Sequence, residues 1–311
     1  MQEILPEFLR TIYPFKPHYL RLRDGQSMHY VDEGFGETVL LLHGHPTWSF
    51  FFRNLICLLR SDFKCMAIDH IGYGMSSKPH GYRYEISQHI ANVIEFVEAM
   101  KFKKFHIIGE DFGVAAALAL AEFWPERISS MSLLNSAVFA MPKLSGVVLM
   151  FKFPLLGFCM STFFNLFTRI YMHLGVLSTM DDAIFDGYLW PHRNLLERSA
   201  VVAGTDDIPW LSDHHSLDTF ERICEKAFLL ANKKIEFFWA NNDFLYTSNV
   251  LEQWKKILPN AFVKHYQSGH LLFEDSPEAM NDVRLFIHGA KDISKDLFRQ
   301  TVVKPRSVSG K

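Results

Sequence analysis

The sequence predicts an α/β fold in which helices cover both faces of a mostly parallel sheet. Short, nearly continuous apolar segments alternate with helix-like segments up to about residue 135. The alternation stops over residues 138–211, which are aromatic-rich and helix-like, and resumes after them. Strands buried on both faces have this continuous apolar character, because helices shield them from water on each side. The pattern therefore predicts one sheet with a helical insertion between two of its parts.

Six segments have the character of buried strands, and two others have helical periodicity. The strand segments are 38–43 (TVLLLH), 63–69 (FKCMAID), 105–109 (FHIIG), 131–135 (MSLLN), 235–240 (IEFFWA) and 261–266 (AFVKHY). Helical patterns occupy 86–99 and 114–123. Strands and helices in this order are typical of repeated βαβ units.

The domain organisation follows from this interruption. We expect an α/β core of residues 1–137 and 212–298, a helical cap of residues 138–211, and a mobile polar tail of residues 299–311. Within the cap, residues 153–167 form 15 positions without a charge, which is short of the roughly 20 that a membrane-spanning helix needs. We predict a buried or ligand-facing helix there; a helix lying on a membrane surface is the alternative.

Composition excludes several classes of protein. The chain has 311 residues, 32 Lys plus Arg against 34 Asp plus Glu, and 49% hydrophobic residues. A wholly disordered chain needs lower hydrophobicity, and a general nucleic-acid binder needs a basic surface that this balance does not suggest. The four cysteines form no C-x-x-C pair, and the N-terminus lacks an export signal. We therefore expect a cytoplasmic protein in a reducing compartment.

No metal or cofactor is predicted. The pairs His214–His215 and His43/His45 lack Asp, Glu or Cys at ligand spacing. The turn after the second strand segment lacks the Lys and the spacing of a phosphate-binding loop.

The strongest chemical signal is the segment GEDFG at residues 109–113. It follows a strand and opens a helix, which is the setting of a nucleophile elbow, where small residues permit a sharp turn. The nucleophile position holds Asp111. The structural alternative is that Asp111 only caps the following helix.

A second signal, HGHP at residues 43–46, ends the first strand segment. In this architecture, the loop after that strand and the residue after the nucleophile each supply a backbone N–H to an oxyanion hole. These residues are His45 and Phe112.

Two further residues complete a candidate constellation. His270 follows the last strand segment and is a natural general base near neutral pH. Asp243 follows the segment IEFFWA and could orient His270. The order Asp111, Asp243, His270 matches that of α/β-hydrolases, which run nucleophile, acid, base.

With these residues identified, the chain resembles an α/β-hydrolase of the haloalkane dehalogenase group over about residues 14–290. The matching segments are 43–55, 69–79, 109–113, 206–210 and 269–275. Within the group it is most similar to the β-lactone decarboxylases of long-chain olefin biosynthesis, through residues 13–22, 69–79 and 134–142. The resemblance implies a mostly parallel eight-stranded sheet with a cap after the sixth strand. It also implies Asp111 as nucleophile, His270 as base and Asp243 as acid.

Three positions depart from the group or complicate its chemistry. Members of the group hold the departing halide with a Trp after the nucleophile and a partnering Asn or Trp; here Phe112 and His45 stand at these places. Phe offers no polar side-chain N–H. Glu110 precedes the nucleophile, and we expect its side chain to point away, since a nearby second carboxylate would raise the pKa of Asp111.

The implied reaction is attack of Asp111 on an electrophilic carbon, followed by attack of His270-activated water on the resulting ester. We predict an apolar alkyl substrate, a β-lactone losing carbon dioxide to give an alkene or a haloalkane. Phe158 and Phe163 would line its pocket. An epoxide hydrolase, with Tyr171 and Tyr188 activating the ring oxygen, is one alternative. A non-catalytic binder of an apolar ligand is another.

The prediction of partners is limited to a small apolar substrate, with no nucleic acid. Contact with a membrane surface lacks the support of a basic run, and the oligomeric state is left open.

Overall fold

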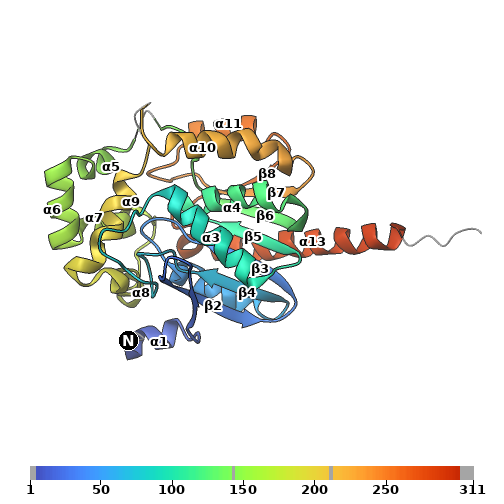
Figure 1. Cartoon of the computed structure of the whole chain (residues 1–311), viewed down its shortest axis with the longest axis horizontal. Helices are drawn as coiled ribbons and strands as arrows, with labels where there is room; N and C mark the ends of the chain where they lie inside the picture. The colour runs from blue at the N-terminus through green and yellow to red at the C-terminus, as the bar shows by residue number, and fades with distance from the viewer. Residues whose placement is uncertain (1–4, 142–143, 210–212, 302–311) are drawn as a thin grey trace, which may run out of the picture.

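A computed structural model describes residues 5–141, 144–209 and 213–301, with side chains described as far as residue 289. Its centre is one eight-stranded sheet flanked by helices (Figure 1). The strands are β1 (His18–Arg21), β2 (Ser27–Gly34), β3 (Glu37–Leu42), β4 (Phe63–Ile68), β5 (Phe105–Gly109), β6 (Ile128–Leu134), β7 (Lys234–Ala240) and β8 (Phe262–Tyr266). Their order across the sheet is β1-β2-β4-β3-β5-β6-β7-β8.

The sheet is mostly parallel, as predicted. The six strands from β3 to β8 run parallel to their neighbours, whereas β2 pairs antiparallel with both β1 and β4. Each of the six predicted strand segments is found. The β1–β2 hairpin lies at the sheet edge, where no residue of β1 is buried and β2 buries only Met28, His29 and Val31. It therefore lacks the continuous apolar signal of the central strands.

Helices of the core flank this sheet on both sides. They are α1 (Glu7–Ile12), α2 (Arg53–Leu59), α3 (Ile86–Met100), α4 (Phe112–Phe123), α10 (Leu217–Glu225), α11 (Ser248–Ile257), α12 (Leu272–Asp275) and α13 (Pro277–Thr301), with short 3₁₀ turns η1 (Ser49–Phe52), η2 (Pro125–Arg127) and η5 (Lys226–Leu230). Alternate residues of each strand serve opposite faces. Leu40 and Leu42 pack with α3 and α4, whereas Val39 and Leu41 pack with α2 and α13.

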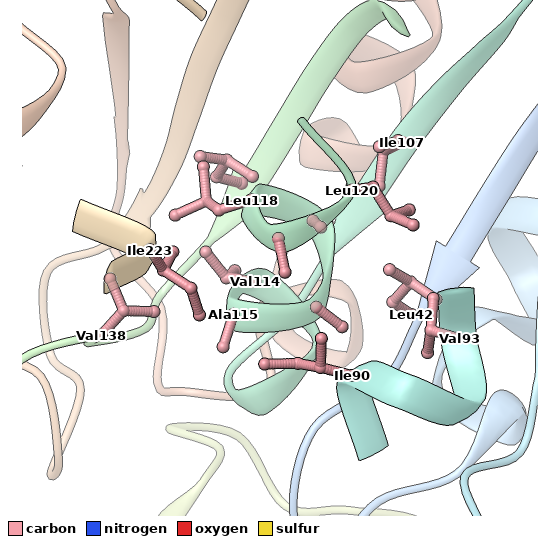
Figure 2. Packing of buried hydrophobic residues seen from close by; sticks show 14 of the residues in the cluster. Leu42, Ile90, Val93, Ile107, Val114, Ala115, Leu118, Leu120, Val138 and Ile223 are labelled. Atoms are coloured by element: carbon pink, nitrogen blue, oxygen red, sulfur yellow. The ribbon is translucent and has the colours of Figure 1, made fainter. Parts of the chain in front are cut away.

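Helix α4 lies especially close to the sheet. Its residues from Gly113 to Ala121 are all buried, and most are alanine. Figure 2 shows its buried side chains among those of Ile90 and Val93 on α3, Ile107 on β5 and Ile223 on α10. A Cβ on Gly113 would lie 2.0 Å from the carbonyl oxygen of Leu42, so only glycine fits. This close packing fixes the N-terminus of α4, where the candidate nucleophile lies.

Between β6 and α10, the regular elements of the described residues are all helices, joined by loops, and none of these residues forms a strand, as predicted. They form α5 (Gly146–Phe151), α6 (Pro154–Phe164), α7 (Leu166–Leu174), α8 (Asp182–Leu189), η3 (Trp190–His192), η4 (Leu195–Arg198) and α9 (Ser199–Asp206). These helices lie together at one end of the molecule (Figure 1). We refer to α5–α9, with η3 and η4, as the cap helices.

Two expectations for this region are wrong. The uncharged segment 153–167 is not one helix, because Asn165 has a left-handed backbone (φ 51°) that separates α6 from α7. Phe158 and Phe163 do not line a buried pocket: their side chains are 48% and 55% exposed. The apolar side chains of α6 therefore point outward.

The last helix runs past the predicted end of the core. Helix α13 continues to Thr301, so the first residues of the expected tail, 299–301, are helical. The rest of that tail, from residue 302, lies outside the described residues. Among the helices that the structure describes, none combines the length and the apolar character needed to cross a membrane.

Candidate active site

The sequence-predicted site residues meet at the carboxyl edge of the sheet. Asp111 lies two residues after the end of β5 and has φ 48° and ψ −120°. A positive φ is uncommon and costly for a residue other than glycine, and such strain clusters at functional sites. Two glycines of the motif have a steric role, because a Cβ on Gly109 would lie 3.1 Å from the backbone of Val114, and Gly113 is confined by Leu42. The segment GEDFG thus forms a sharp strand-to-helix turn that presents Asp111.

Two donors hold the buried carboxylate of Asp111. The backbone N–H of His45 donates to Oδ2 at 2.8 Å, and the hydroxyl of Tyr246 donates to Oδ1. Gly44 permits this approach, because a Cβ there would lie 2.3 Å from the Cβ of Asp111. The two oxygens of Asp111 therefore have different surroundings: a fixed backbone donor at Oδ2 and a side-chain donor at Oδ1.

His270 and Asp243 are brought together beside Asp111. Nδ1 of His270 lies 2.7 Å from Oδ2 of Asp243, and both side chains are buried. Asn135, directly after β6, donates to the same Asp243 oxygen at 2.8 Å and accepts the N–H of Ala240 at 2.6 Å. Asn135 thereby fixes Asp243, and the acid after β7 holds His270 on one side.

The expectation for Glu110 is wrong. Its side chain does not point away from the site: Oε1 lies 3.0 Å from Nε2 of His270, and Oε2 accepts the N–H of Gly44 at 2.8 Å. Glu110 is fully buried. The sequence context could not reveal this, because side-chain direction at a strained turn does not follow strand alternation. Both ring nitrogens of His270 therefore face carboxylates.

These contacts shift the titration of the site in identifiable directions. Burial, and next the Glu110 carboxylate, raise the pKa of Asp111 to about 6, against the opposing effects of His270 and of the hydrogen bonds from Tyr246 and His45. Burial alone would lower the pKa of His270, but the carboxylates of Asp243 and Glu110 outweigh it and raise that pKa well above its usual value. The site therefore favours a His270 imidazolium beside an ionised Asp111 carboxylate at neutral pH.

The side chains at the expected leaving-group positions offer no free donor. Nδ1 of His45 lies 2.9 Å from the hydroxyl of Tyr73, and Nε2 lies 3.0 Å from that of Thr205. Burial, and next the neighbouring His192, lower the pKa of His45 well below its usual value, so the ring is neutral. The ring of Phe112 stacks on that of His45 at 5.8 Å. His45 thus contributes its backbone N–H to the site, while its ring is bonded elsewhere.

The tyrosines around the site differ from the pair suggested by the sequence. Tyr171 on α7 packs edge-on against His270, with ring centres 5.3 Å apart, and its buried hydroxyl has no hydrogen-bond partner among the described residues. Tyr188 instead donates to Glu274, which pairs with Arg53. Tyr246, three residues after Asp243, is the hydroxyl that reaches Asp111. The sequence offers one hint of this role, which is that Tyr246 follows Asp243 at the same edge of the sheet.

One group of potential metal ligands is found elsewhere. Asp207, His214 and His215 bring their ligand atoms within 4.8 Å of one another, although their spacing in the sequence did not suggest it. The oxygens of Asp207 are already engaged: Oδ1 accepts from Ser216 and lies 3.0 Å from His215, and Oδ2 accepts the N–H of Ile86 at 2.6 Å. These contacts describe a hydrogen-bonded junction that needs no ion.

Known proteins resemble this chain in sequence. A sequence profile of the α/β-hydrolase fold matches residues 37–169. The chain is 30% identical over 288 residues to the cis-3-alkyl-4-alkyloxetan-2-one decarboxylase of Shewanella oneidensis, covering 90% of each chain. It is 38% identical over 125 residues to haloalkane dehalogenase 2 of Mycobacterium tuberculosis, covering 40% of this chain and 43% of that one.

Solved structures show the same fold. The haloalkane dehalogenase DbeA of Bradyrhizobium elkani superposes with a TM-score of 0.80 at 22% identity, covering 90% of this chain and 99% of that one. The sheet order, the position of the cap helices and the similarity along nearly the whole chain lead to one conclusion. The chain belongs to the haloalkane dehalogenase-like α/β-hydrolases, in the family that includes the cis-3-alkyl-4-alkyloxetan-2-one decarboxylases.

Proposed function

We propose that the protein decarboxylates a β-lactone with two alkyl substituents to an alkene, with Asp111 as the nucleophile. The observation that carries this proposal is the contact between Nε2 of His270 and Glu110 at 3.0 Å. In a hydrolytic cycle, that nitrogen would deprotonate the water that attacks the Asp111 ester. A carboxylate occupies its hydrogen-bonding direction here and favours the protonated ring. Chemistry that needs no water suits this site better.

The proposed reaction has two steps and balances without water. Oδ1 of Asp111 attacks the ring carbon that bears the lactone oxygen, and the carbon–oxygen bond breaks to release a carboxylate that stays attached to the neighbouring carbon. The bond to this carboxylate then breaks, carbon dioxide departs, and its electrons form the carbon–carbon double bond. The bond from carbon to Oδ1 breaks at the same time and returns its electrons to Asp111.

The surroundings of Asp111 suit both steps. Oδ2 accepts the backbone N–H of His45 at 2.8 Å, whereas Oδ1 accepts the hydroxyl of Tyr246. A side-chain hydroxyl can rotate away when substrate binds and a backbone N–H cannot, so we assign the attack to Oδ1. In the second step Asp111 is the leaving group, so the N–H of His45, the hydroxyl of Tyr246 and the positive ring of His270 stabilise the carboxylate that reforms. We assign Asp243, with Asn135 behind it, the role of orienting His270.

Haloalkane cleavage is less well supported by this geometry. A departing halide needs donors, yet Phe112 has no polar side-chain group and both nitrogens of the His45 ring already face hydroxyls. The carboxylate released from a strained lactone ring depends less on such donors because it stays attached to the substrate.

Epoxide hydrolysis is the second candidate, favoured by one observation. The hydroxyl of Tyr246 and the unpartnered buried hydroxyl of Tyr171 both belong to side chains beside Asp111 and His270. Two phenols could donate to an opening epoxide oxygen. The second half of that reaction still needs water activated by His270, which Glu110 opposes. A non-catalytic binder would have no need of the strained turn at Asp111.

We further propose that residues 138–211 act as a cap over the substrate, that residues 1–137 and 212–298 form the catalytic core, and that the protein works in the cytoplasm. The buried face of α7, which presents Phe167 and Tyr171 to the site, supports the first assignment. The four cysteines are all free thiols, in keeping with a reducing compartment.

The test uses a synthetic cis-3,4-dialkyl β-lactone, a terminal epoxide and a bromoalkane, each given separately to the purified protein. We expect an alkene and carbon dioxide from the lactone alone, with no ¹⁸O entering Asp111 when the reaction runs in H₂¹⁸O. Asp111→Asn should abolish product formation, by at least about a thousandfold. A hydroxy acid product labelled with ¹⁸O would identify a hydrolase instead. If the protein binds these compounds but converts none of the three, it would instead be a non-catalytic binder of an apolar ligand.

A further inference from the structure

Helix α6 exposes its large apolar side chains and buries its small ones. Gly157 and Ser161 are its only buried residues, and a Cβ on Gly157 would lie 1.8 Å from the carbonyl oxygen of Phe151. On the outside, Leu155 is 79% and Phe164 is 69% exposed. A helix that faces water normally has the opposite arrangement. The outer surface of α6 is therefore suited to an apolar environment.

The exposed residues form one surface at the outer end of the cap helices. Helix α6 lies at the edge of the molecule farthest from the end of α13 (Figure 1). The turn η4 packs beside it, and Arg198 of η4 donates to the carbonyl of Thr162 at 2.6 Å. We call this surface the α6 face; its members are the exposed residues Phe153, Leu155, Leu156, Phe158, Phe163 and Phe164 of α6 and its N-cap, with Leu195 and Leu196 of η4. Such a patch on a water-soluble chain marks an interaction site.

Charge around the α6 face points to the kind of partner. Helix α6 itself carries no charge, and residues 128–180 contain no Asp or Glu, although the whole chain has more acidic than basic residues. The same stretch contains Lys143, Lys152 and Arg169. Arg169, on α7, is exposed. Lys143 lies outside the described residues, and the ammonium of Lys152 donates to the carbonyls of Thr205 and Asp206 at 2.9 Å. Arg169 is therefore the basic residue that could face a partner. An uncharged apolar helix followed by an exposed arginine, in a stretch without acidic residues, matches the boundary between acyl chains and anionic headgroups.

We infer that the α6 face docks on the surface of a lipid bilayer that contains anionic lipids, with α6 lying in the plane of the interface. Phe and Leu side chains would enter the acyl region, and the exposed Arg169, which follows α6, would lie on the headgroup side. Helix α6 has 11 residues, which is too few to span a bilayer but suits an interfacial helix. The inference rests on this surface alone and does not depend on the proposed reaction.

The experiment is flotation of the full chain with vesicles of phosphatidylcholine and phosphatidylglycerol (7:3), and with phosphatidylcholine alone. We expect the protein to float with the anionic vesicles, to do so less in high salt, and to bind pure phosphatidylcholine more weakly. The double variant L155Q/F164Q should reduce the bound fraction at least tenfold. The matched control is F228Q/F262Q. It replaces two aromatic residues of the α/β core domain whose side chains are exposed to a similar degree, 66% and 67%, and it should bind vesicles as the unmodified chain does.

Both variants change exposed side chains, so thermal unfolding should stay within a few degrees of the unmodified protein and exclude misfolding as the cause. Absence of vesicle binding by the unmodified chain would overturn the inference, as would equal losses in the two double variants. Sedimentation velocity supplies a further decisive reading. A dimer that L155Q/F164Q converts to a monomer, without any vesicle binding, would assign the α6 face to a second copy of the chain instead.

Discussion

At the scale of single residues, Glu110 sets the charge state of the site. It contacts His270 with one oxygen and the N–H of Gly44 with the other, and its charge raises the pKa of Asp111. In Glu110→Gln the amide oxygen keeps the Gly44 contact, so the amide N–H₂ faces Nε2 of His270 and favours an unprotonated nitrogen there. The single substitution therefore alters both the nucleophile and the histidine.

The first prediction concerns the fall, at acid pH, in the rate at which Asp111 forms the alkyl-enzyme; we call this fall the acid limb. A protonated Asp111 cannot attack, so the rate of alkyl-enzyme formation should fall below about pH 6. In Glu110→Gln the pKa of Asp111 loses the effect of the Glu110 charge, while His270, still paired with Asp243, is protonated in the acid range. The pH at which the rate falls should therefore move lower, by roughly one unit. Intact-mass measurement of the alkyl-enzyme during a single turnover, from pH 4.5 to 8, gives this pH dependence for the unmodified chain and for Glu110→Gln. Glu252→Gln, at an exposed site remote from Asp111, should leave the limb in place; an unmoved limb in Glu110→Gln would disprove the electrostatic role.

The second prediction concerns Tyr246, whose hydroxyl donates to Oδ1 of Asp111. A hydrogen bond to a charged group contributes about 1.5–3 kcal/mol, so Tyr246→Phe should lower kcat roughly 10- to 100-fold if that bond stabilises the departing Asp111. Steady-state kinetics measure this, with KM expected to change little. Tyr188→Phe is the matched control, because its hydroxyl binds Glu274 rather than the site. Equal kcat values for the two variants would argue against a role for Tyr246 in the reaction.

The third prediction concerns stability rather than turnover. The folded-state pKa of Asp111 is raised from 3.8 to about 6, so the native protein binds this proton more tightly than the unfolded chain, and its stability falls as pH rises from about 4 to 6. Above pH 6 the ionised Asp111 destabilises the fold. Asp111→Asn should therefore stabilise it by about 1–3 kcal/mol near pH 7.5, and by less at pH 5. Thermal unfolding at the two pH values tests this; a larger gain at pH 5 would contradict it.

At the scale of elements, the sequence predicts what depends on local pattern. The six central strands and helices α3 and α4 were predictable, because burial on both faces and helical periodicity leave clear apolar signals. Asp111, Asp243 and His270 were predictable as a candidate set because each lies shortly after a strand. The direction of Glu110 and the approach of Tyr246 depend on contacts between distant segments, and no local pattern encodes them.

The break between α6 and α7 shows the same limit. Residues 153–167 are continuously uncharged, yet Asn165 ends α6 in a left-handed conformation, which Asn tolerates better than most residues. Hydrophobicity identified the segment but could not tell which side would be buried. Gly157 lets α6 approach Phe151 of α5 closely, and because α6 buries only Gly157 and Ser161, its phenylalanines face outward.

The fourth prediction tests that packing. In Gly157→Ala the new methyl group would meet the backbone carbonyl of Phe151 at 1.8 Å, and a backbone atom cannot rotate away. Overpacking of this kind costs about 1–3 kcal/mol. Gly146→Ala, in the neighbouring α5, is the control because nothing lies within 4 Å of its added Cβ. Helix propensity favours alanine over glycine at both positions, so thermal unfolding should show a lower Tm only for Gly157→Ala. A matching loss in both variants would contradict the role of the close approach to Phe151.

At the scale of the whole molecule, the cap helices connect to the core through a buried charged junction. Tyr188 of α8 donates to Glu274 of α12, and the guanidinium of Arg53 on α2 donates to both oxygens of Glu274 at 2.6 and 2.8 Å. The side chains of Arg53 and Glu274 are 3% and 8% exposed. The Glu274 carboxylate helps to keep the pKa of Arg53 above its usual value, although burial opposes it. A short contact network thus joins the cap helices to two separate core helices.

The fifth prediction ranks two substitutions at this junction. Glu274→Gln leaves the Arg53 charge buried without its partner, and breaking a buried pair in this way costs about 3–5 kcal/mol. Tyr188→Phe removes one hydrogen bond but leaves the ion pair intact, so its cost should be about 1–2 kcal/mol. Urea unfolding measures both values. Because Tyr188 alone belongs to the cap helices, hydrogen exchange in Tyr188→Phe should rise over residues 182–189 before it rises in β4 or β5. Uniform acceleration across the sheet would mean that the junction supports global stability and does not specifically anchor the cap helices.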